Sequence, residues 1–290
     1  MRVFFTMARW VVLVVAAASL SACFTLTADP RALVLQPDGA IRALSLTCPP
    51  PLPEPDSTAA AAPLDPRSIR VVTWNVHKEG DRGWQKDLTT LIAGNDIVLL
   101  QETTLAPEML DALHEANLRW IMASSFAYLG VDIGVLTASH APPVASCTQR
   151  VLEPLIRLPK SAIISWFAVD GRAQRLAVAN VHAINFSLSL DGYREQFMAL
   201  ADTLATHEGP IILAGDLNTW SAARSEVVEE VARRLALSEV KLAEDKRSLF
   251  FGNQLDHILV RGLRVVSSAA IAVDSSDHNP VTATLEWPAE

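Results

Sequence analysis

The chain has 290 residues, half of them hydrophobic, and its 24 basic and 32 acidic residues give a formal net charge of −8 at pH 7. This composition excludes a disordered protein and supplies enough apolar residues for one large core or two modest ones. The acidic balance argues against nonspecific capture of a long polyanion by a basic surface, although it is compatible with a local basic groove.

The first residues, 1–22, predict a lipoprotein-type signal peptide. They contain Arg2 and Arg9 but no acidic residue, followed by an apolar stretch over 10–20 and by small residues directly before Cys23. In bacterial lipoprotein signals this cysteine is lipidated and becomes the mature N-terminus. The apolar stretch of about 11 residues is short for a membrane-spanning helix, which needs about 20. A buried or uncleaved N-terminal helix is the alternative interpretation.

We therefore expect an exported protein that is anchored to a membrane through a lipidated Cys23 and faces the periplasm or the cell exterior. An inner-membrane anchor or a cytoplasmic location is the alternative. Beyond Cys23 the sequence has two cysteines, Cys48 and Cys147. In an oxidising compartment they can form a disulfide that ties the N-terminal arm to the main domain, or they can remain buried free thiols.

Composition separates an N-terminal arm, 23–66, from one folded domain, 67–290. The last part of the arm, 48–66, is rich in proline and alanine and has no apolar period, so we expect it to be an extended tether. The length of the domain fits a single unit, and the sequence within it contains no internal repeat.

The first half of the domain alternates strands with helices. Apolar patterns predict a strand at 69–76, a helix near 84–93, a strand at 96–101, a helix near 106–116, and strands near 119–123 and 131–137. Two further strands at 161–169 and 174–183 are joined by Asp170-Gly171, a dipeptide that favours a tight hairpin turn.

The second half begins with a helix at 191–207, for which Asp191 is the expected N-cap, and a strand at 210–215. Residues Tyr193, Phe197, Leu200 and Leu204 recur on one face of this helix. Next come a helix at 221–236 capped by Ser221 and strands near 256–260, 263–273 and 280–287. Strands alternate with helices in the first half of the domain, and hairpins dominate the second half. This order favours two sheets packed face to face with helices outside, rather than one doubly wound parallel sheet.

Six short strings place carboxylates, amides and histidines at the ends of apolar runs. They are WNVH (74–77), LLQE (99–102), NVH (180–182), GDLN (215–218), LDH (255–257) and SDHNP (276–280). A polar residue at the end of a buried strand is costly unless it is paired or bound to a cation. The six strings together therefore indicate one metal-dependent active site.

On these strings the chain resembles the endonuclease/exonuclease/phosphatase superfamily of Mg²⁺-dependent phosphoesterases, over residues 69–287. The stretches LEPLIRLPKSA (152–162) and NVHAINFSL (180–188) resemble an uncharacterised bacterial branch of that superfamily. The resemblance implies an α/β, DNase I-like fold. This is a four-layer α/β sandwich in which two mixed β-sheets pack face to face with helices outside.

The resemblance also implies a metal site. Glu102 would be the principal Mg²⁺ ligand, Asn75 would supply a neutral oxygen beside it, and Asp277 would belong to the metal environment. Mg²⁺ prefers oxygen ligands and keeps several waters, so one or two carboxylates and an amide are enough, and Mn²⁺ is a possible substitute. The alternative for Glu102 taken alone is a solvated strand end.

Five catalytic residues are implied in the same way. Asp216 would orient or deprotonate the attacking water, and Asn218 would hold that water or a phosphate oxygen. His278 would act at the scissile phosphate, oriented by Asp256, and the role of base stays joint between Asp216 and His278. His182 would contact a phosphate oxygen or assist the leaving group. The alternatives are a local Asp/Asn turn at 216–218 and a packed, non-catalytic His182.

Several further residues are weaker candidates. Asn185, His77, Lys78 and Lys160 are equally compatible with phosphate contacts and with solvated positions. His257 stands where many relatives carry tyrosine, so the resemblance does not determine which side chain lines the pocket wall at this position. Three tryptophans fit either the core or base-stacking platforms, namely Trp74, Trp220 and Trp287.

The predicted function is Mg²⁺-dependent phosphoester hydrolysis, of the phosphodiesterase or nuclease type, by in-line attack of an activated water. The alternative is a catalytically inactive, membrane-anchored protein of the same fold that binds phosphate ligands. A zinc hydrolase acting on other bonds would need a His-rich ligand set. The substrate stays open between nucleic acid, a phospholipid head group and a small phosphate, and no obligate protein partner is inferred.

Overall fold

The computed structural model of the chain describes residues 24–25, 31–36, 38–48, 63–155, 157–187 and 189–289. The predicted signal peptide with Cys23, and segment 49–62 of the predicted tether, lie outside the described residues. Within the described part, no helix is long and apolar enough to cross a membrane.

Nine strands of the described residues form the first sheet, in the order β16-β17-β4-β5-β7-β6-β2-β3, with β1 also paired to β6. Neighbours β4 and β5 are parallel, and β5 and β7 are antiparallel, so the sheet is mixed. The strands are β1 (Phe24–Thr25), β2 (Arg31–Leu35), β3 (Ile41–Leu44), β4 (Ile69–Asn75), β5 (Ile97–Thr104), β6 (Arg119–Tyr128), β7 (Val131–Ser139), β16 (Arg264–Ala270) and β17 (Val281–Glu286).

The second sheet has the order β12-β15-β11-β10-β9-β8 among the described residues and is also mixed, because β10 and β11 are parallel. Its strands are β8 (Ala145–Leu152), β9 (Pro159–Phe167), β10 (Leu176–His182), β11 (Ile211–Asp216), β12 (Ser238–Glu239) and β15 (Asp256–Arg261). A separate small ribbon is made of β13 (Leu249–Phe250) and β14 (Asn253–Gln254).

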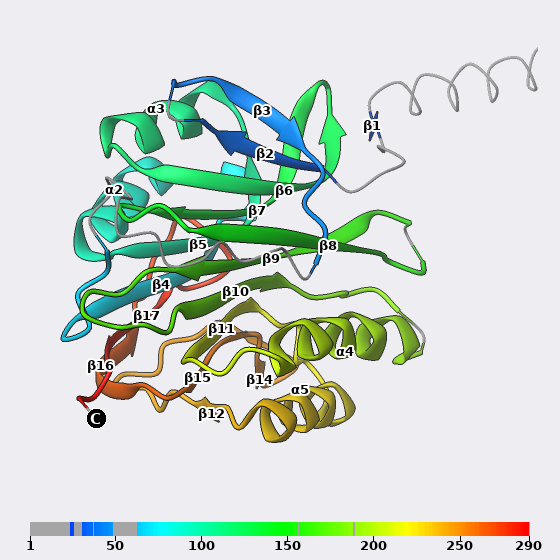
Figure 1. Cartoon of the computed structure of the whole chain (residues 1–290). Helices are drawn as coiled ribbons and strands as arrows, with labels where there is room; N and C mark the ends of the chain where they lie inside the picture. Colours follow the sequence, from blue (N-terminus) through cyan, green and yellow to red (C-terminus); the bar gives the residue numbers. More distant parts are fainter. Residues whose placement is uncertain are drawn as a thin grey trace, which may run out of the picture.

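The helices lie outside the two sheets (Figure 1). Helices α2 (Trp84–Gly94) and α3 (Pro107–Glu115) share a hydrophobic core with β4 and β5, whereas α4 (Asp191–Ala205) and α5 (Ala222–Leu235) share another with β10 and β11. A third core joins the sheets face to face, for example Val71 and Leu99 with Val178 and Ile212. The predicted four-layer α/β sandwich is confirmed.

Burial explains why the central strands could be located from the sequence. All seven residues of β10 and all six of β11 are buried, because one face packs on the other sheet and the opposite face packs on helices. The apolar face predicted for α4 is buried too, at Tyr193, Phe197 and Leu200. Asp191, however, is the first helical residue and Leu190 is the N-cap, so that predicted cap is wrong.

The structure also differs from the prediction in the connections between strands and at the sheet edges. The β9–β10 connection spans residues 168–175 instead of a two-residue turn, because Leu64 pairs with Val169 and accepts the amide of Asp170. Strand β8 was not predicted, since its sequence ASCTQRVL mixes polar and apolar residues at a sheet edge. Ser221 is the N-cap of α5 as expected, although its side chain makes no capping hydrogen bond.

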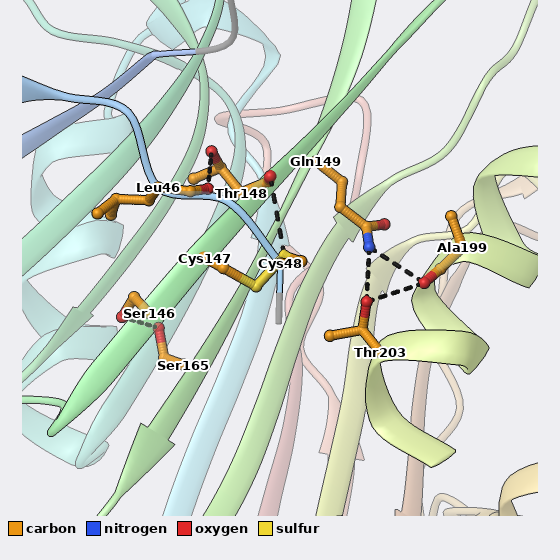
Figure 2. The surroundings of a disulfide bond; sticks show 9 residues. All are labelled: Leu46, Cys48, Ser146, Cys147, Thr148, Gln149, Ser165, Ala199 and Thr203. Carbon is orange, nitrogen blue, oxygen red and sulfur yellow. Dashed lines mark hydrogen bonds between the residues drawn. A yellow bond between two sulfur atoms is a disulfide. The ribbon is translucent and has the colours of Figure 1, made fainter. Parts of the chain in front are cut away.

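The N-terminal arm extends the first sheet, so the folded unit includes residues upstream of position 67. β2 pairs with β6 and β3 pairs with β2. A disulfide joins Cys48, at the end of the described arm, to Cys147 on β8 (Figure 2). Beside it, the amide of Thr148 donates to the carbonyl oxygen of Leu46 over 3.0 Å. The alternative of two free thiols is thereby excluded, and the arm is held against both sheets.

Candidate active site

Strand register brings the predicted polar residues to one end of the sandwich. In the first sheet Asn75 pairs with Gln101 at the carboxyl ends of the parallel strands β4 and β5. In the second sheet His182 pairs with Asp216, and Asp216 pairs with Asp256 on the neighbouring strand. Because residues in register on adjacent strands lie within about 5 Å of each other, three predicted site residues form one row.

Glu102 is turned out of its strand by a β-bulge. The pairing of β5 with β7 shifts between Leu100 and Thr103, and Glu102 has a φ of 52°, in the left-handed region. A bulge re-aims a side chain at the cost of backbone strain, which is a common feature of functional sites. The sequence predicted the position of Glu102 but not this backbone conformation.

The Glu102 carboxylate faces cations. It pairs with the ammonium of Lys78, and its Oε1 lies 3.8 Å from Lys160 Nζ and 3.6 Å from His182 Nε2. Burial would raise the pKa of Glu102, but the charges of His182, Lys160 and Lys78 together lower it to about 2. The carboxylate is therefore ionised throughout the physiological pH range.

His182 lies between the two sheets' carboxylates. Its Nε2 is 3.5 Å from Asp216 Oδ2 and accepts a 2.8 Å hydrogen bond from Lys160 Nζ. Burial, followed by the charge of Lys160, lowers the pKa of His182 to about 4, against the opposing effect of Asp216 and Glu102. The imidazole is thus neutral at pH 7, with Nε2 as the hydrogen-bond acceptor.

Asp216 is held in one orientation by two neighbours. Asn75 Nδ2 donates to Asp216 Oδ2 over 3.0 Å, and the backbone amide of Asn218 donates to Asp216 Oδ1 over 3.1 Å. Asn218 has a φ of 50° and donates its own side-chain amide to the carbonyl oxygen of Ala183 over 3.0 Å. Asn75 Oδ1 accepts the amide of His77 over 3.0 Å. The buried amides therefore position the carboxylate.

His278 and Asp256 form a buried pair. His278 Nδ1 lies 2.7 Å from Asp256 Oδ2. Burial would lower the pKa of His278, but the charges of Asp256 and Asp216 raise it to about 10. Trp74 Nε1 donates to the carbonyl oxygen of His278 over 2.9 Å, which fixes the loop that carries the histidine. The predicted orienting role of Asp256 agrees with this geometry.

The donor set suits a hard cation. Ligand atoms of Asp216, Asp256 and His278 all lie within 4.8 Å of one another. Asp256 Oδ1 is buried and has no hydrogen-bond partner among the described residues, which is costly for a carboxylate oxygen unless a cation or water meets it. The oxygen-rich chemistry of the cluster fits a divalent cation such as those that carboxylates bind.

Asp277 does not join this cluster. Its side chain is 61% exposed, and its Oδ1 lies 3.8 Å from Nδ1 of the half-exposed His77. His77 itself pairs with Asp81 over 2.9 Å. The sequence grouped Asp277 with the metal ligands because it adjoins His278, but the chain bends at residues 274–278, where the His278 side chain is buried and that of Asp277 is exposed.

The weaker candidates separate into two groups. Lys78 and Lys160 lie at the Glu102 carboxylate and belong to the site. Asn185 instead accepts a hydrogen bond from Trp220 Nε1 over 3.0 Å and stabilises a loop. Trp74 and Trp287 are buried in hydrophobic cores. His257, next to Asp256 on β15, points to Glu239 and Thr219 instead of the site.

Four buried polar residues that support the site were not assigned a role from the sequence, namely Gln101, Asn180, Glu153 and Arg224. Arg224 donates to the carbonyl oxygens of Ile184, Asn185 and Asn218 and so ties together the loops after β10 and β11. Its guanidinium also lies over Tyr193. A signal was available, since each of Gln101 and Asn180 is a polar residue inside an apolar run.

A family model described as Endonuclease/Exonuclease/phosphatase family matches residues 72–278. The chain belongs to this family. A UPF0294 protein of Yersinia pseudotuberculosis is 38% identical over 232 residues, which cover 80% of this chain and 86% of that protein. A UPF0294 protein of Klebsiella pneumoniae is 37% identical over 226 residues, covering 77% and 84%. The predicted kinship with a bacterial branch of the family is confirmed.

Solved structures show the same fold. An endonuclease/exonuclease/phosphatase family protein from Leptotrichia buccalis matches with a TM-score of 0.60 at 15% identity, covering 75% of this chain and 99% of that one. The human Nocturnin catalytic domain with bound sulfate matches with a TM-score of 0.57 at 17% identity, covering 78% and 97%. Family and fold are consistent with a phosphoesterase or nuclease-type hydrolase.

Proposed function

We propose that this chain is a Mg²⁺-dependent phosphoester hydrolase, with Mn²⁺ as a possible substitute. The observation that carries the proposal is the convergence of Glu102, His182, Asp216, Asp256 and His278, from β5, β10, β11, β15 and the β16–β17 connection, at one end of the sandwich. Buried carboxylates that are paired with histidines in one cluster are typical of catalytic sites.

The residues that would hold Mg²⁺ are Glu102 and Asn75, and Asn75 adjoins the buried cluster of Asp216, Asp256 and His278 through its 3.0 Å hydrogen bond to Asp216. Glu102 is ionised, and Asn75 Oδ1 accepts one hydrogen bond, which leaves its second lone pair available. We leave the exposed Asp277 outside this ligand set. A bound Mg²⁺ would offset negative charge on the phosphate oxygens.

The chain's own residues would bind the phosphate and handle the proton. Asp216, fixed by Asn75 and Asn218, is the group able to take a proton from the attacking water. His278, held by Asp256 and protonated at neutral pH because its pKa is raised to about 10, would stabilise negative charge on the phosphate or give a proton to the leaving oxygen. Lys160 carries positive charge and touches His182, so this pair would contact the phosphate oxygens. Asn218 would position the water beside Asp216. This arrangement supports direct attack of water on phosphorus.

The test uses purified protein with bis-p-nitrophenyl phosphate and with plasmid DNA, in Mg²⁺, in Mn²⁺ and in EDTA. Turnover is expected with either metal and is expected to be lost in EDTA and in His278→Ala. His257→Ala is the matched control, because His257 is the histidine that precedes His278 in the chain and faces away from the site. Absence of metal-dependent turnover on every phosphoester would contradict the proposal. Calorimetric binding of phosphate without hydrolysis would favour the non-catalytic alternative.

We further propose that the protein is exported and anchored to a membrane through a lipidated Cys23. The disulfide between Cys48 and Cys147 supports an oxidising compartment, because disulfides are rare in the cytosol. Fractionation of cells that express the full chain or its Cys23→Ser variant tests the anchor. We expect radiolabelled fatty acid in the parent chain alone, and label in both chains would overturn the proposed lipidation site.

A further inference from the structure

Exposed apolar side chains gather on the loops that surround the candidate active site. Leu129, at the tip of the β6–β7 hairpin, is 68% exposed, and Tyr128 precedes it. Leu152 is exposed at the end of β8, Leu155 is exposed in the β8–β9 connection, and Phe186 is exposed in the loop after β10. We call Tyr128, Leu129, Leu152, Leu155 and Phe186 the apolar rim. Scattered exposed apolar residues are normal, but a group on neighbouring loops marks an interaction surface.

The rim adjoins the reactive groups. A cavity of about 140 Å³ is lined at one end by Glu102, Lys160 and His182, and elsewhere by Phe126, Leu158 and Phe186. Glu153 joins two of the rim loops, because its buried carboxylate accepts the backbone amides of Asn185 and Phe186. The space beside the proposed phosphate site is therefore mostly apolar. It suits a phosphoester whose organic part is apolar.

Strand β1 lies at the same place. Phe24 pairs with Tyr128, and Thr25 pairs with Ala127, so β1 runs along the β6–β7 hairpin. Figure 1 shows β1 beside this hairpin at the upper right, and the β8–β9 connection projects on the right of the molecule. Cys23 directly precedes Phe24 in the sequence, and Phe24 is the residue of β1 that pairs with Tyr128 of the rim.

The arm does not act as a long spacer between this cysteine and the domain. β2 and β3 pair with the first sheet, and the Cys48–Cys147 disulfide holds the end of the described arm. The predicted tether, 48–66, follows these elements instead of preceding them. An acyl chain on Cys23 would thus enter a membrane next to Leu129 and Tyr128.

We propose that the apolar rim docks on the lipid bilayer and that the site hydrolyses phosphoesters of membrane lipids. This inference rests on the proposed hydrolase function. Partly inserted leucine and aromatic side chains would add to the attachment that a lipid on Cys23 supplies and would fix the orientation of the domain on the bilayer. Docking places the cavity mouth at the level of the head groups. Water oxygen then bonds to phosphorus as the ester P–O bond breaks, and the water proton passes to the leaving oxygen.

The experiment measures turnover of the lipidated full-length mature protein on two substrates, namely soluble bis-p-nitrophenyl phosphate and vesicles of phosphatidylglycerol. The double variant Leu129→Ser/Leu155→Ser removes rim leucines that do not line the cavity. The control is Val266→Ser on β16, at the far edge of the first sheet, because Val266 is 52% exposed and Leu155 is 53% exposed. The rim variant is expected to lose about tenfold or more on vesicles and nothing on the soluble substrate. Val266→Ser should match the parent on both.

A second readout does not depend on catalysis. Deuterium uptake by the amides of 127–131 should slow when the protein is mixed with phosphatidylglycerol vesicles in EDTA. Turnover on the soluble diester without turnover on vesicles would overturn the lipid substrate, and unchanged deuterium uptake would overturn the docking. Equal losses on both substrates in the rim variant would also overturn it. Failure on every substrate, soluble ones included, would instead count against the proposed hydrolase.

Discussion

Gln101 Nε2 donates a 2.7 Å hydrogen bond to Asn180 Oδ1 across the interface between the two sheets. Gln101 directly precedes Glu102 on β5, and Asn180 lies two residues before His182 on β10. The side-chain amide of Asn180 also donates to the carbonyl oxygen of Leu136 over 2.9 Å. Both side chains are fully buried. This bond therefore fixes β5, which carries Glu102, against β10, which carries His182.

Asn180→Leu should lower the free energy of unfolding by about 1–3 kcal/mol, because the buried amide of Gln101 loses one of its two side-chain acceptors and keeps Thr73 Oγ1. Urea unfolding of the parent, Asn180→Leu, Gln101→Leu and the double variant measures this. The double variant should recover part of the loss, since neither polar partner is then left alone. Strictly additive losses would show that the two residues do not interact.

Replacement of Asp256 by Asn should alter the pH dependence of stability. The pKa of His278 is raised to about 10 in the folded protein, so its contribution to stability is complete below the unfolded value of about 6.5 and is lost as the pH rises through about 10. The difference in unfolding free energy between parent and Asp256→Asn should therefore shrink from pH 6 to pH 10. Urea unfolding in EDTA at several pH values measures it. A difference in unfolding free energy that does not change with pH would contradict the raised pKa of His278 and its pairing with Asp256.

Lys160→Met should raise the pKa of His182 above its value of about 4, because the ammonium that lies 2.8 Å from Nε2 is removed. The unfolded chain takes up a proton on this histidine near pH 6.5, whereas the folded protein does so only near pH 4, so the folded state loses stability as the pH falls between these values. The variant should therefore lose less stability than the parent over this range. Nuclear magnetic resonance titration of the ring in metal-free protein measures the shift. Lys78→Met is the control, because Lys78 pairs with Glu102 and not with His182. Equal shifts in both variants would argue against a specific Lys160 effect.

Glu102→Gln should reduce metal-dependent turnover by about 100-fold or more, because the charged ligand is lost while the shape is kept. Asp277→Asn should stay close to the parent, since this side chain is exposed and lies outside the buried cluster. Mg²⁺ titration calorimetry and turnover of bis-p-nitrophenyl phosphate measure both effects. Comparable losses in the two variants would place Asp277 among the ligands after all.

Loss of the disulfide should lower the free energy of unfolding by about 2–5 kcal/mol. The bond closes a loop of 99 residues and holds the arm against β8 (Figure 2). Denaturant unfolding with and without reductant measures the effect. Reductant should destabilise the parent and leave Cys48→Ser unchanged. A parent chain that is insensitive to reductant would contradict the prediction.

The sequence by itself determined the strand cores, the layered α/β fold and most of the candidate site. Runs such as 97–100 and 211–214 are continuously apolar because both faces of their strands are covered, and this burial is encoded locally. The polar residue that ends such a run is then visible in the sequence, as at Glu102 and Asp216.

Only the tertiary structure decided the contacts between segments that are distant in sequence. Four features depend on how strands of different sheets and edges meet. They are the bulge that turns Glu102, the approach of Lys160 to His182, the exposure of Asp277 and the pairing of β1 with Tyr128. Periodicity reports which face of an element is buried, but it carries no information about which partner covers that face. For this reason the polar residues of the candidate site could be predicted from local patterns, whereas their arrangement around one another and their position relative to β1 required the fold.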